Sequence, residues 1–180
     1  FYDFDLEQWG FKRNNKEEWS SYFKRLQSHP AWGTKNIVSW DVNIQGAREI
    51  NSTVTANPEV YYFSFVNSNT VLDSSSGRHI PNNTMSFIIR SNARLMGMKK
   101  AYFEDGTSTD STWFENDGIV NKKSMYGPTT GLNGADPITN YSEDEILIPG
   151  QWYAMNGLKM DHRRMVCLLY TSDAADDSGC

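Results

Sequence analysis

The chain has 180 residues, of which 38% are hydrophobic and 13% aromatic, enough to build a folded core rather than a disordered tail. Its 22 acidic and 17 basic side chains leave a net charge of −5, whereas nucleic-acid-binding proteins usually carry a basic surface. No apolar run reaches the roughly 20 residues that a membrane-spanning helix needs. The composition therefore argues against a nucleic-acid partner and against a transmembrane segment.

The two ends of the chain differ in character from its interior. The sequence opens at Phe1 without an initiating methionine or a leader pattern, which favours a truncated start. From Cys167 onward it resembles a translated sequencing adapter, so residues 167–180 are predicted to be a non-native tail, with a natural acidic tail as the alternative. Both cysteines lie in this stretch, so cysteine spacing gives no information on the native domain, residues 1–166.

Apolar residues at helical spacing predict a first helix that ends before Pro30. Asn15 and Glu18 have the spacing of an N-cap and capping box. The apolar stripe falls at i, i+3, i+4 and i+7, through Trp19, Tyr22, Phe23 and Leu26. Core packing is sufficient to explain such a stripe.

A second helix is predicted over residues 45–56, followed by a strand over residues 60–66. The strand segment is β-branched and aromatic, and nearly every position is apolar, which favours burial on both faces of a parallel sheet. A helix followed by a buried strand is half of a βαβ unit. We therefore predict an α/β fold with a mostly parallel sheet and flanking helices.

The later part of the chain is less regular. Residues 85–89 could start either a strand or a helix. Glycine, asparagine, serine and threonine are dense over residues 106–112 and 127–140, which predicts long loops. Short apolar segments follow at residues 145–148 and 152–155.

The candidate chemistry rests on few residues. Of the three histidines, His29 lies at a helix end and His79 in a polar loop, and His162 follows an apolar stretch where a loop should leave a sheet. Asp117 lies in an Asn-Asp-Gly turn signature, where aspartate usually bonds its own backbone. Taken alone, both Asp117 and His162 are explained by ordinary turn and surface roles.

The sequence resembles the staphylococcal and thermoalkaliphilic bacillus-type triacylglycerol lipases. The opening Tyr-Asp-Phe-x-Leu-x-Gln-Trp-Gly signature, residues 2–10, and the Asn-Asp-Gly-Ile-Val-Asn block, residues 116–121, carry the resemblance most specifically. Further matching positions extend it to residue 166, and they include Trp19, Tyr22, Phe23, Pro58, Tyr61, Tyr62, Ser64, Phe65, Trp152, Asp161 and His162.

The resemblance implies the C-terminal portion of an α/β-hydrolase fold, in which acid and histidine follow the serine in chain order. It assigns Asp117 as the triad acid and His162 as the triad histidine. Histidine would act as general base toward serine, and aspartate would fix the imidazole tautomer. No Gly-x-Ser-x-Gly elbow occurs in the 180 residues, so the nucleophile and oxyanion hole are expected in an absent N-terminal half.

Two metal positions depart from the family pattern. The one zinc ligand that this half would supply aligns with Asn36, and a neutral amide is a poor substitute for carboxylate, which makes zinc doubtful. A calcium-binding carboxylate of the family aligns with Arg164, and one carbonyl ligand would fall near Thr84. Calcium stays an expectation by resemblance only.

The resemblance thus implies a fragment of a secreted carboxylic-ester hydrolase, a triacylglycerol lipase, that is inactive without its other half. Its partners would be an ester lipid and the rest of the polypeptide. Three glycosylation-type sequons, at Asn51, Asn82 and Asn140, permit a secreted context. The alternative is a non-catalytic secreted module that binds lipids or surfaces, which the two altered metal positions favour.

Overall fold

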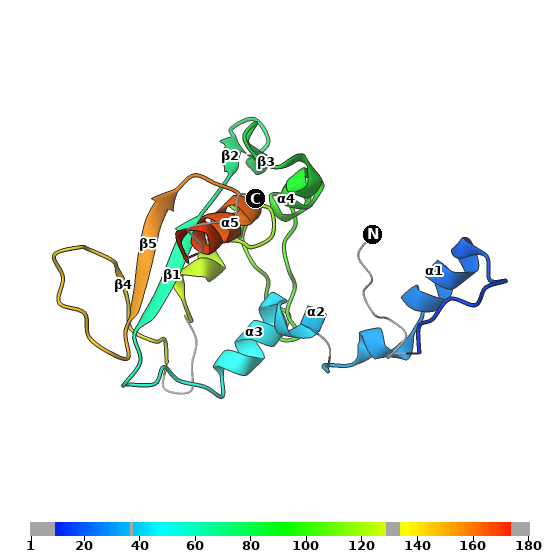
Figure 1. Ribbon diagram of the computed structural model, residues 1–180, viewed down its shortest axis with the longest axis horizontal. Helices are drawn as coiled ribbons and strands as arrows, with labels where there is room; N and C mark the ends of the chain where they lie inside the picture. Colours follow the sequence, from blue (N-terminus) through cyan, green and yellow to red (C-terminus); the bar gives the residue numbers. More distant parts are fainter. Residues whose placement is uncertain (1–9, 37, 129–133, 174–180) are drawn as a thin grey trace. The chain divides into compact units, whose positions relative to one another are not determined.

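The computed structural model describes residues 10–36, 38–128 and 134–173 of the chain (Figure 1). The chain divides into two compact units, Phe1–Ala47 and Arg48–Cys180. The predictions that fall on residues 1–9, including most of the opening signature, lie outside the described residues.

The first unit contains the predicted first helix in shorter form. Helix α1 covers Trp19–Gln27, and its N-cap is Glu18, which makes no side-chain capping bond, so the predicted Asn15 cap is wrong. Glu17 instead accepts a hydrogen bond from the backbone of Asn14 and a bidentate one from Arg25. The 3₁₀ helix η2, Pro30–Gly33, and the short α2, Val38–Asp41, follow.

Packing of the α1 stripe is uneven. Tyr22 is buried, whereas Trp19 and Phe23 are more than half exposed. The three rings nevertheless contact one another, since Trp19 stacks on Phe23 and meets Tyr22 edge-on. The predicted core role therefore holds for Tyr22 and not for the whole stripe.

Helix α3, Ile44–Asn51, spans the point at which the chain divides into its two units and ends earlier than predicted. The hydroxyl groups of Ser52 and Thr53 donate to the carbonyl oxygens of Glu49 and Ile50, three residues back. Such local side-chain bonds compete with continued helix, which accounts for the early end.

A parallel sheet organises the second unit and confirms the predicted α/β fold. It consists of β1, Tyr62–Asn67; β4, Ile138–Asn140; and β5, Trp152–Leu158. The spatial order is β1-β5-β4, with β5 central and both pairings parallel (Figure 1). Strand β4 lies at the end of the predicted 127–140 loop, and residues 145–148 form no strand.

Strand β1 is not buried on both faces as the sequence suggested. Val66 is almost fully buried, but Phe63 is 42% exposed. The rings of Phe63 and Tyr153 stack across the β1–β5 pair. Of these two aromatic residues only Tyr153 is fully buried.

The segment after β1 forms a hairpin and a helix. Strands β2, Thr70–Asp73, and β3, Arg78–Pro81, pair in antiparallel fashion. The ambiguous residues 85–89 begin a helix, because η3, Phe87–Ile89, leads directly into α4, Arg90–Met96. Met85, Ile89 and Ala93 form a buried apolar cluster there.

Shorter elements complete the second unit. The 3₁₀ helices η4, Ser111–Trp113, and η5, Lys122–Tyr126, flank the Asn-Asp-Gly turn. Helix α5, His162–Asp173, follows β5 and continues past Cys167, while residues 174–180 lie outside the described residues. The proposed boundary after residue 166 therefore stays a prediction. In the described part of the chain, no helix is both long and apolar enough to cross a bilayer.

Candidate functional site

The parallel pairing of β1 and β5 brings together chain segments that are far apart in sequence. Asn67 at the end of β1 is in register with Leu158 at the end of β5. In a parallel sheet, the carboxyl ends of the strands lie at one edge, and the loops that follow them meet there. The candidate site is formed at this edge by Asn67, the turn at Asp117 and the start of α5.

The Asn-Asp-Gly turn holds Asp117 by the local bonding that its sequence predicts. The backbone N–H of Asp117 donates to the carbonyl of Val120 over 3.1 Å. Its Oδ1 accepts the N–H groups of Ile119 at 2.9 Å and Val120 at 2.8 Å. The side chain is completely buried. One carboxylate oxygen is thus committed to the turn, and Oδ2 is directed away from it.

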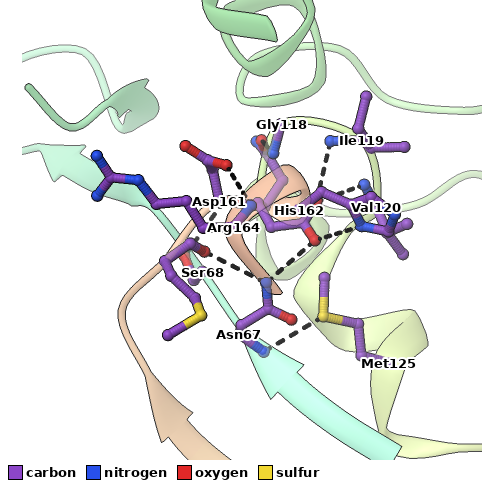
Figure 2. A network of polar contacts seen from close by, with 12 residues as sticks. Asn67, Ser68, Gly118, Ile119, Val120, Met125, Asp161, His162 and Arg164 are labelled. Carbon is purple, nitrogen blue, oxygen red and sulfur yellow. Dashed lines mark hydrogen bonds and ion pairs between the residues drawn. The ribbon is translucent and has the colours of Figure 1, made fainter. Parts of the chain in front are cut away.

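That second oxygen faces His162. The distance from His162 Nδ1 to Asp117 Oδ2 is 2.9 Å, although the two residues are 45 positions apart. The backbone N–H of His162 also donates to the carbonyl of Asp117 over 3.1 Å. Figure 2 shows His162 at the start of the α5 ribbon, beside the loop that carries Gly118, Ile119 and Val120.

This contact constrains how the imidazole can work. An ionised carboxylate is only an acceptor, so Nδ1 carries the hydrogen in this pair and Nε2 of the neutral ring is left as an acceptor. The His162 side chain is 38% exposed, whereas that of Asp117 is 0% exposed. None of the residues that the structure describes hydrogen-bonds to Nε2, so the basic nitrogen is available to a reacting group.

Asn67 joins the acid to the segment that precedes the histidine. Its Nδ2 donates to Asp117 Oδ2 and to the carbonyl oxygen of Met160, each over 3.2 Å. The residue is 3% exposed. Dashed lines in Figure 2 join Asn67, near the end of the β1 arrow, to its partners.

Asn116 holds the turn through hydrogen bonds of its side chain. It is fully buried, and its Nδ2 donates to the carbonyls of Ala93 and Phe114. Its Oδ1 accepts the N–H of Gly118 over 2.9 Å. The turn that carries Asp117 is therefore tied both to α4 and to its own preceding residues.

Asp161 anchors the start of α5. Its side chain is fully buried, and Oδ1 accepts the N–H of Arg164 over 3.1 Å, as an N-cap does. Its Oδ2 accepts the N–H of Ser86 over 2.7 Å, 75 positions away. Arg163 adds a bond from its guanidinium to the hydroxyl of Ser86. These contacts fix the first turn of α5, where His162 lies.

The structure thus brings together the two residues singled out in the sequence, Asp117 and His162. His79 has a partner that the sequence did not indicate, since its Nδ1 lies 3.3 Å from the hydroxyl of Thr70. Burial lowers the pKa of the His79 imidazole below its ordinary value. His29 packs edge-on against Phe11 in the first unit.

The glycine of the turn supports a stability prediction. Gly118 has φ +100°, and a Cβ there would lie 2.7 Å from Ile89 Cδ1 and 3.3 Å from Ile89 Cβ. Because both the backbone and the packing oppose a side chain, we expect Gly118→Ala to lower the free energy of unfolding by about 1–3 kcal/mol. Urea denaturation measures this change in the free energy of unfolding.

Gly106→Ala is the matched control, because Gly106 has φ +80° but a Cβ added there would meet nothing within 4 Å. This substitution should lower the free energy of unfolding by about 1–2 kcal/mol through backbone strain alone. Equal losses for the two variants would contradict the role of the Gly118–Ile89 contact.

The described residues contain no group of three or more His, Cys, Asp or Glu side chains that could hold a metal ion. Arg164 presents its backbone N–H to Asp161, and the Thr84 hydroxyl donates to Asn69 Oδ1. Asn36 is exposed in the first unit. Both oxygens of Asp161 accept N–H groups. Calcium, expected by resemblance only, and the doubt about zinc both stay predictions.

Sequence reasoning missed Asn67, Asn116 and Asp161 as parts of this site. Asn116 and Asp161 belong to the blocks that resemble the family, but neither was given a role. Asn67 ends an apolar strand, and a polar residue at the carboxyl end of a parallel strand is a usable signal for a site. Its partners are 50 and 93 positions away, so only the folded chain identifies them.

Comparison with known proteins gives a consistent picture. The family described as "Lipase-like, C-terminal domain" matches residues 1–135. The chain is 29% identical over 161 residues to a lipase from Staphylococcus hyicus, covering 89% of this chain and 23% of that protein. It is also 29% identical over 126 residues to Lipase 1 from Staphylococcus aureus, covering 70% of this chain and 17% of the relative.

The chain is also similar to solved protein structures. EstA from Clostridium botulinum matches with a TM-score of 0.75 and 34% identity, over 97% of this chain and 42% of that one. Staphylococcus hyicus lipase matches with a TM-score of 0.65 and 27% identity, over 89% of this chain and 38% of that one. The chain therefore spans less than half of these structures and about a quarter or less of the curated relatives. The resemblance to staphylococcal lipases is confirmed.

Proposed function

The chain belongs to the lipase-like C-terminal domain family, and on that premise we propose that it is part of a carboxylic-ester hydrolase with an α/β-hydrolase fold. The proposed activity is that of a triacylglycerol lipase. The observation that carries the proposal is the 2.9 Å contact between buried Asp117 and partly exposed His162. A buried acid that orients an accessible imidazole is the arrangement that serine hydrolases require.

In the proposed mechanism, His162 acts as general base and then as general acid. Its Nε2 takes the proton of a serine hydroxyl while the serine oxygen bonds to the ester carbonyl carbon. As the tetrahedral intermediate collapses, the bond to the alkoxide breaks and Nε2 returns the proton to it. A water then repeats the sequence on the acyl-enzyme, releasing a fatty acid and restoring the serine.

Asp117 would serve this cycle without itself being protonated. Its negative charge stabilises the imidazolium that forms when Nε2 holds a proton, and its Oδ2 keeps Nδ1 in the protonated tautomer. The N–H groups of Ile119 and Val120 hold the carboxylate in place. The acid is therefore pre-organised before substrate binds.

The proposal places the nucleophile and the oxyanion hole outside these 180 residues, because the sequence lacks a Gly-x-Ser-x-Gly elbow. The partners would be the rest of the same polypeptide and an ester lipid, and the site of action would be extracellular. No step of the mechanism passes through a metal ion. A calcium site in the whole protein would need ligands from beyond the described residues.

The test uses the whole polypeptide encoded by the reading frame that contains this chain. It is assayed on emulsified triolein and on p-nitrophenyl butyrate, and then labelled with a fluorophosphonate, which reacts with activated serines. We expect hydrolysis of both esters and a label on one serine outside residues 1–180. Peptide mapping by mass spectrometry locates the label, and the protein's presence in the culture medium tests its secretion.

The outcomes separate the parts of the proposal. A folded protein that hydrolyses neither ester and takes no label would overturn the hydrolase function and favour a binding module. Hydrolysis of the butyrate ester without triolein would retain the hydrolase and replace the lipase assignment with an esterase. A label within residues 1–180 would show that the nucleophile is placed incorrectly.

A further inference from the structure

We propose that Asn67 is a positioning residue that sets the geometry of the Asp117–His162 pair; this inference rests on the proposed function and deepens it. Asn67 does not contact the reacting atoms. It contacts the acid and the segment leading to the base, which belong to different loops. Its role would be to fix the position of these two loops relative to each other at the end of the sheet.

The position of Asn67 is itself well fixed. It is the last residue of β1 and is in register with Leu158 of β5. Its backbone N–H lies 3.4 Å from the sulfur of Met125, a further contact on the same strand end. At 3% exposure, its amide is shielded from competing water. The side chain therefore extends from the end of a hydrogen-bonded strand, just after a shift in the β1–β5 register between Phe65 and Asn67.

The amide nitrogen makes two contacts that no other side chain of this size reproduces. It donates one hydrogen to Asp117 Oδ2 and the other to the carbonyl of Met160, two residues before His162. Both partners are acceptors only. Aspartate has no hydrogen to donate when ionised, serine has one and leucine has none. The site therefore selects an amide for its chemistry and not only for its volume.

The contact with Asp117 involves Oδ2, the carboxylate oxygen that also bonds to His162. Oδ2 receives both the Asn67 amide and His162 Nδ1, whereas Oδ1 is held by the turn. The two donors on Oδ2 fix the rotation of the carboxylate plane. Without the Asn67 donor, one buried lone pair of Oδ2 loses its partner, and the orientation of Oδ2 toward the imidazole then depends on the turn bonds to Oδ1 and on His162 itself.

The contact with Met160 involves the segment that leads to His162, the other member of the pair. Met160 precedes Asp161, which caps α5, and His162 is the first residue of that helix. By holding the Met160 carbonyl, Asn67 fixes the path of the chain from β5 into α5. The same nitrogen thus controls the distance between Asp117 and His162 from both sides.

The test compares Asn67→Leu and Asn67→Asp with Asn69→Leu in the whole polypeptide. The first removes both donors at similar volume, and the second replaces them with an acceptor. Asn69 is an equally buried asparagine two residues on, whose Oδ1 accepts the hydroxyl of Thr84. Its side chain hydrogen-bonds to neither Asp117 nor His162, and its Nδ2 has no partner among the described residues. Asn69→Leu therefore reports the effect of an apolar replacement at a buried asparagine that does not bond to the pair.

We expect Asn67→Leu to lower kcat on p-nitrophenyl butyrate by about 10- to 100-fold, with little change in KM, as loss of a hydrogen bond to a charged group predicts. Asn67→Asp should lower kcat at least as far. Asn69→Leu should lower the thermal midpoint while retaining most of kcat. Equal kcat in Asn67→Leu and Asn69→Leu would overturn the inference.

A proton NMR measurement keeps the inference testable even without activity. The proton on His162 Nδ1, bonded to Asp117, gives a downfield resonance that His162→Gln identifies by its loss. We expect Asn67→Leu to broaden this resonance or shift it upfield, and Asn69→Leu to leave it unchanged. An inactive wild-type protein whose resonance depends on Asn67 would defeat the proposed function alone. A resonance unaffected by Asn67→Leu would defeat the positioning role.

Discussion

Replacing His162 with glutamine is expected to lower kcat for ester hydrolysis by the whole polypeptide by about 10⁵- to 10⁶-fold, as loss of the base does in serine hydrolases. Glutamine retains an amide that can donate to Asp117 Oδ2. It has no atom that takes a proton near neutral pH, so neither serine activation nor leaving-group protonation is possible. Steady-state kinetics on p-nitrophenyl butyrate measure the loss, and circular dichroism checks the fold.

His79→Gln is the control for that experiment. His79 is a partly buried histidine of the β2–β3 hairpin whose ring bonds to the hydroxyl of Thr70 and, among the described residues, not to Asp117. Its replacement should change stability slightly and leave kcat close to the wild-type value. If His162→Gln retained a comparable fraction of kcat, another group would have to be the base, and the proposed mechanism would be wrong.

The sequence predicted the main elements of the fold because their signals are local. Helical spacing identified α1, and the β-branched and aromatic run identified β1 to within two residues. The errors have physical causes. Hydroxyl bonds at Ser52 and Thr53 ended α3 early, and the three-residue β4 depends on pairing with β5, which no local pattern records.

Burial was harder to predict than secondary structure. The apolar character of β1 suggested two covered faces, yet Phe63 is 42% exposed in the structure. Hydrophobic pattern indicates which residues could be buried, but what covers them depends on the arrangement of other elements. The same reasoning applies to Trp19 and Phe23 on α1.

The candidate site could be predicted only in part. Asp117 and His162 could be named because short blocks around each resemble the lipase family, and neither block alone shows that the two residues meet. The structure supplies that contact through parallel pairing of β1 with β5 and the turn at Gly118. Asn67 has no comparable block, since its importance comes entirely from acceptors on two distant loops.

Asp117→Asn is expected to lower kcat by about 10⁴-fold, because the amide removes the charge that stabilises the imidazolium and can favour the wrong tautomer. A loss of folding stability should accompany this fall in kcat. Both carboxylate oxygens accept N–H groups, Oδ1 from the turn and Oδ2 from His162 and Asn67. Whichever way the asparagine is turned, its NH₂ group faces donors, so the free energy of unfolding should fall by about 1–3 kcal/mol.

Asp161→Asn separates the chemical effect from this structural one. Asp161 is as buried as Asp117 and also accepts backbone N–H groups with both oxygens, but its carboxylate does not bond to the imidazole. We expect it to lower the thermal midpoint as Asp117→Asn does, and to reduce kcat far less. A similar fall in kcat for both variants would mean that displacement of His162, which Asp161 also helps to hold, accounts for the loss without a chemical role for the Asp117 charge. Kinetics and thermal unfolding on the same samples distinguish the two results.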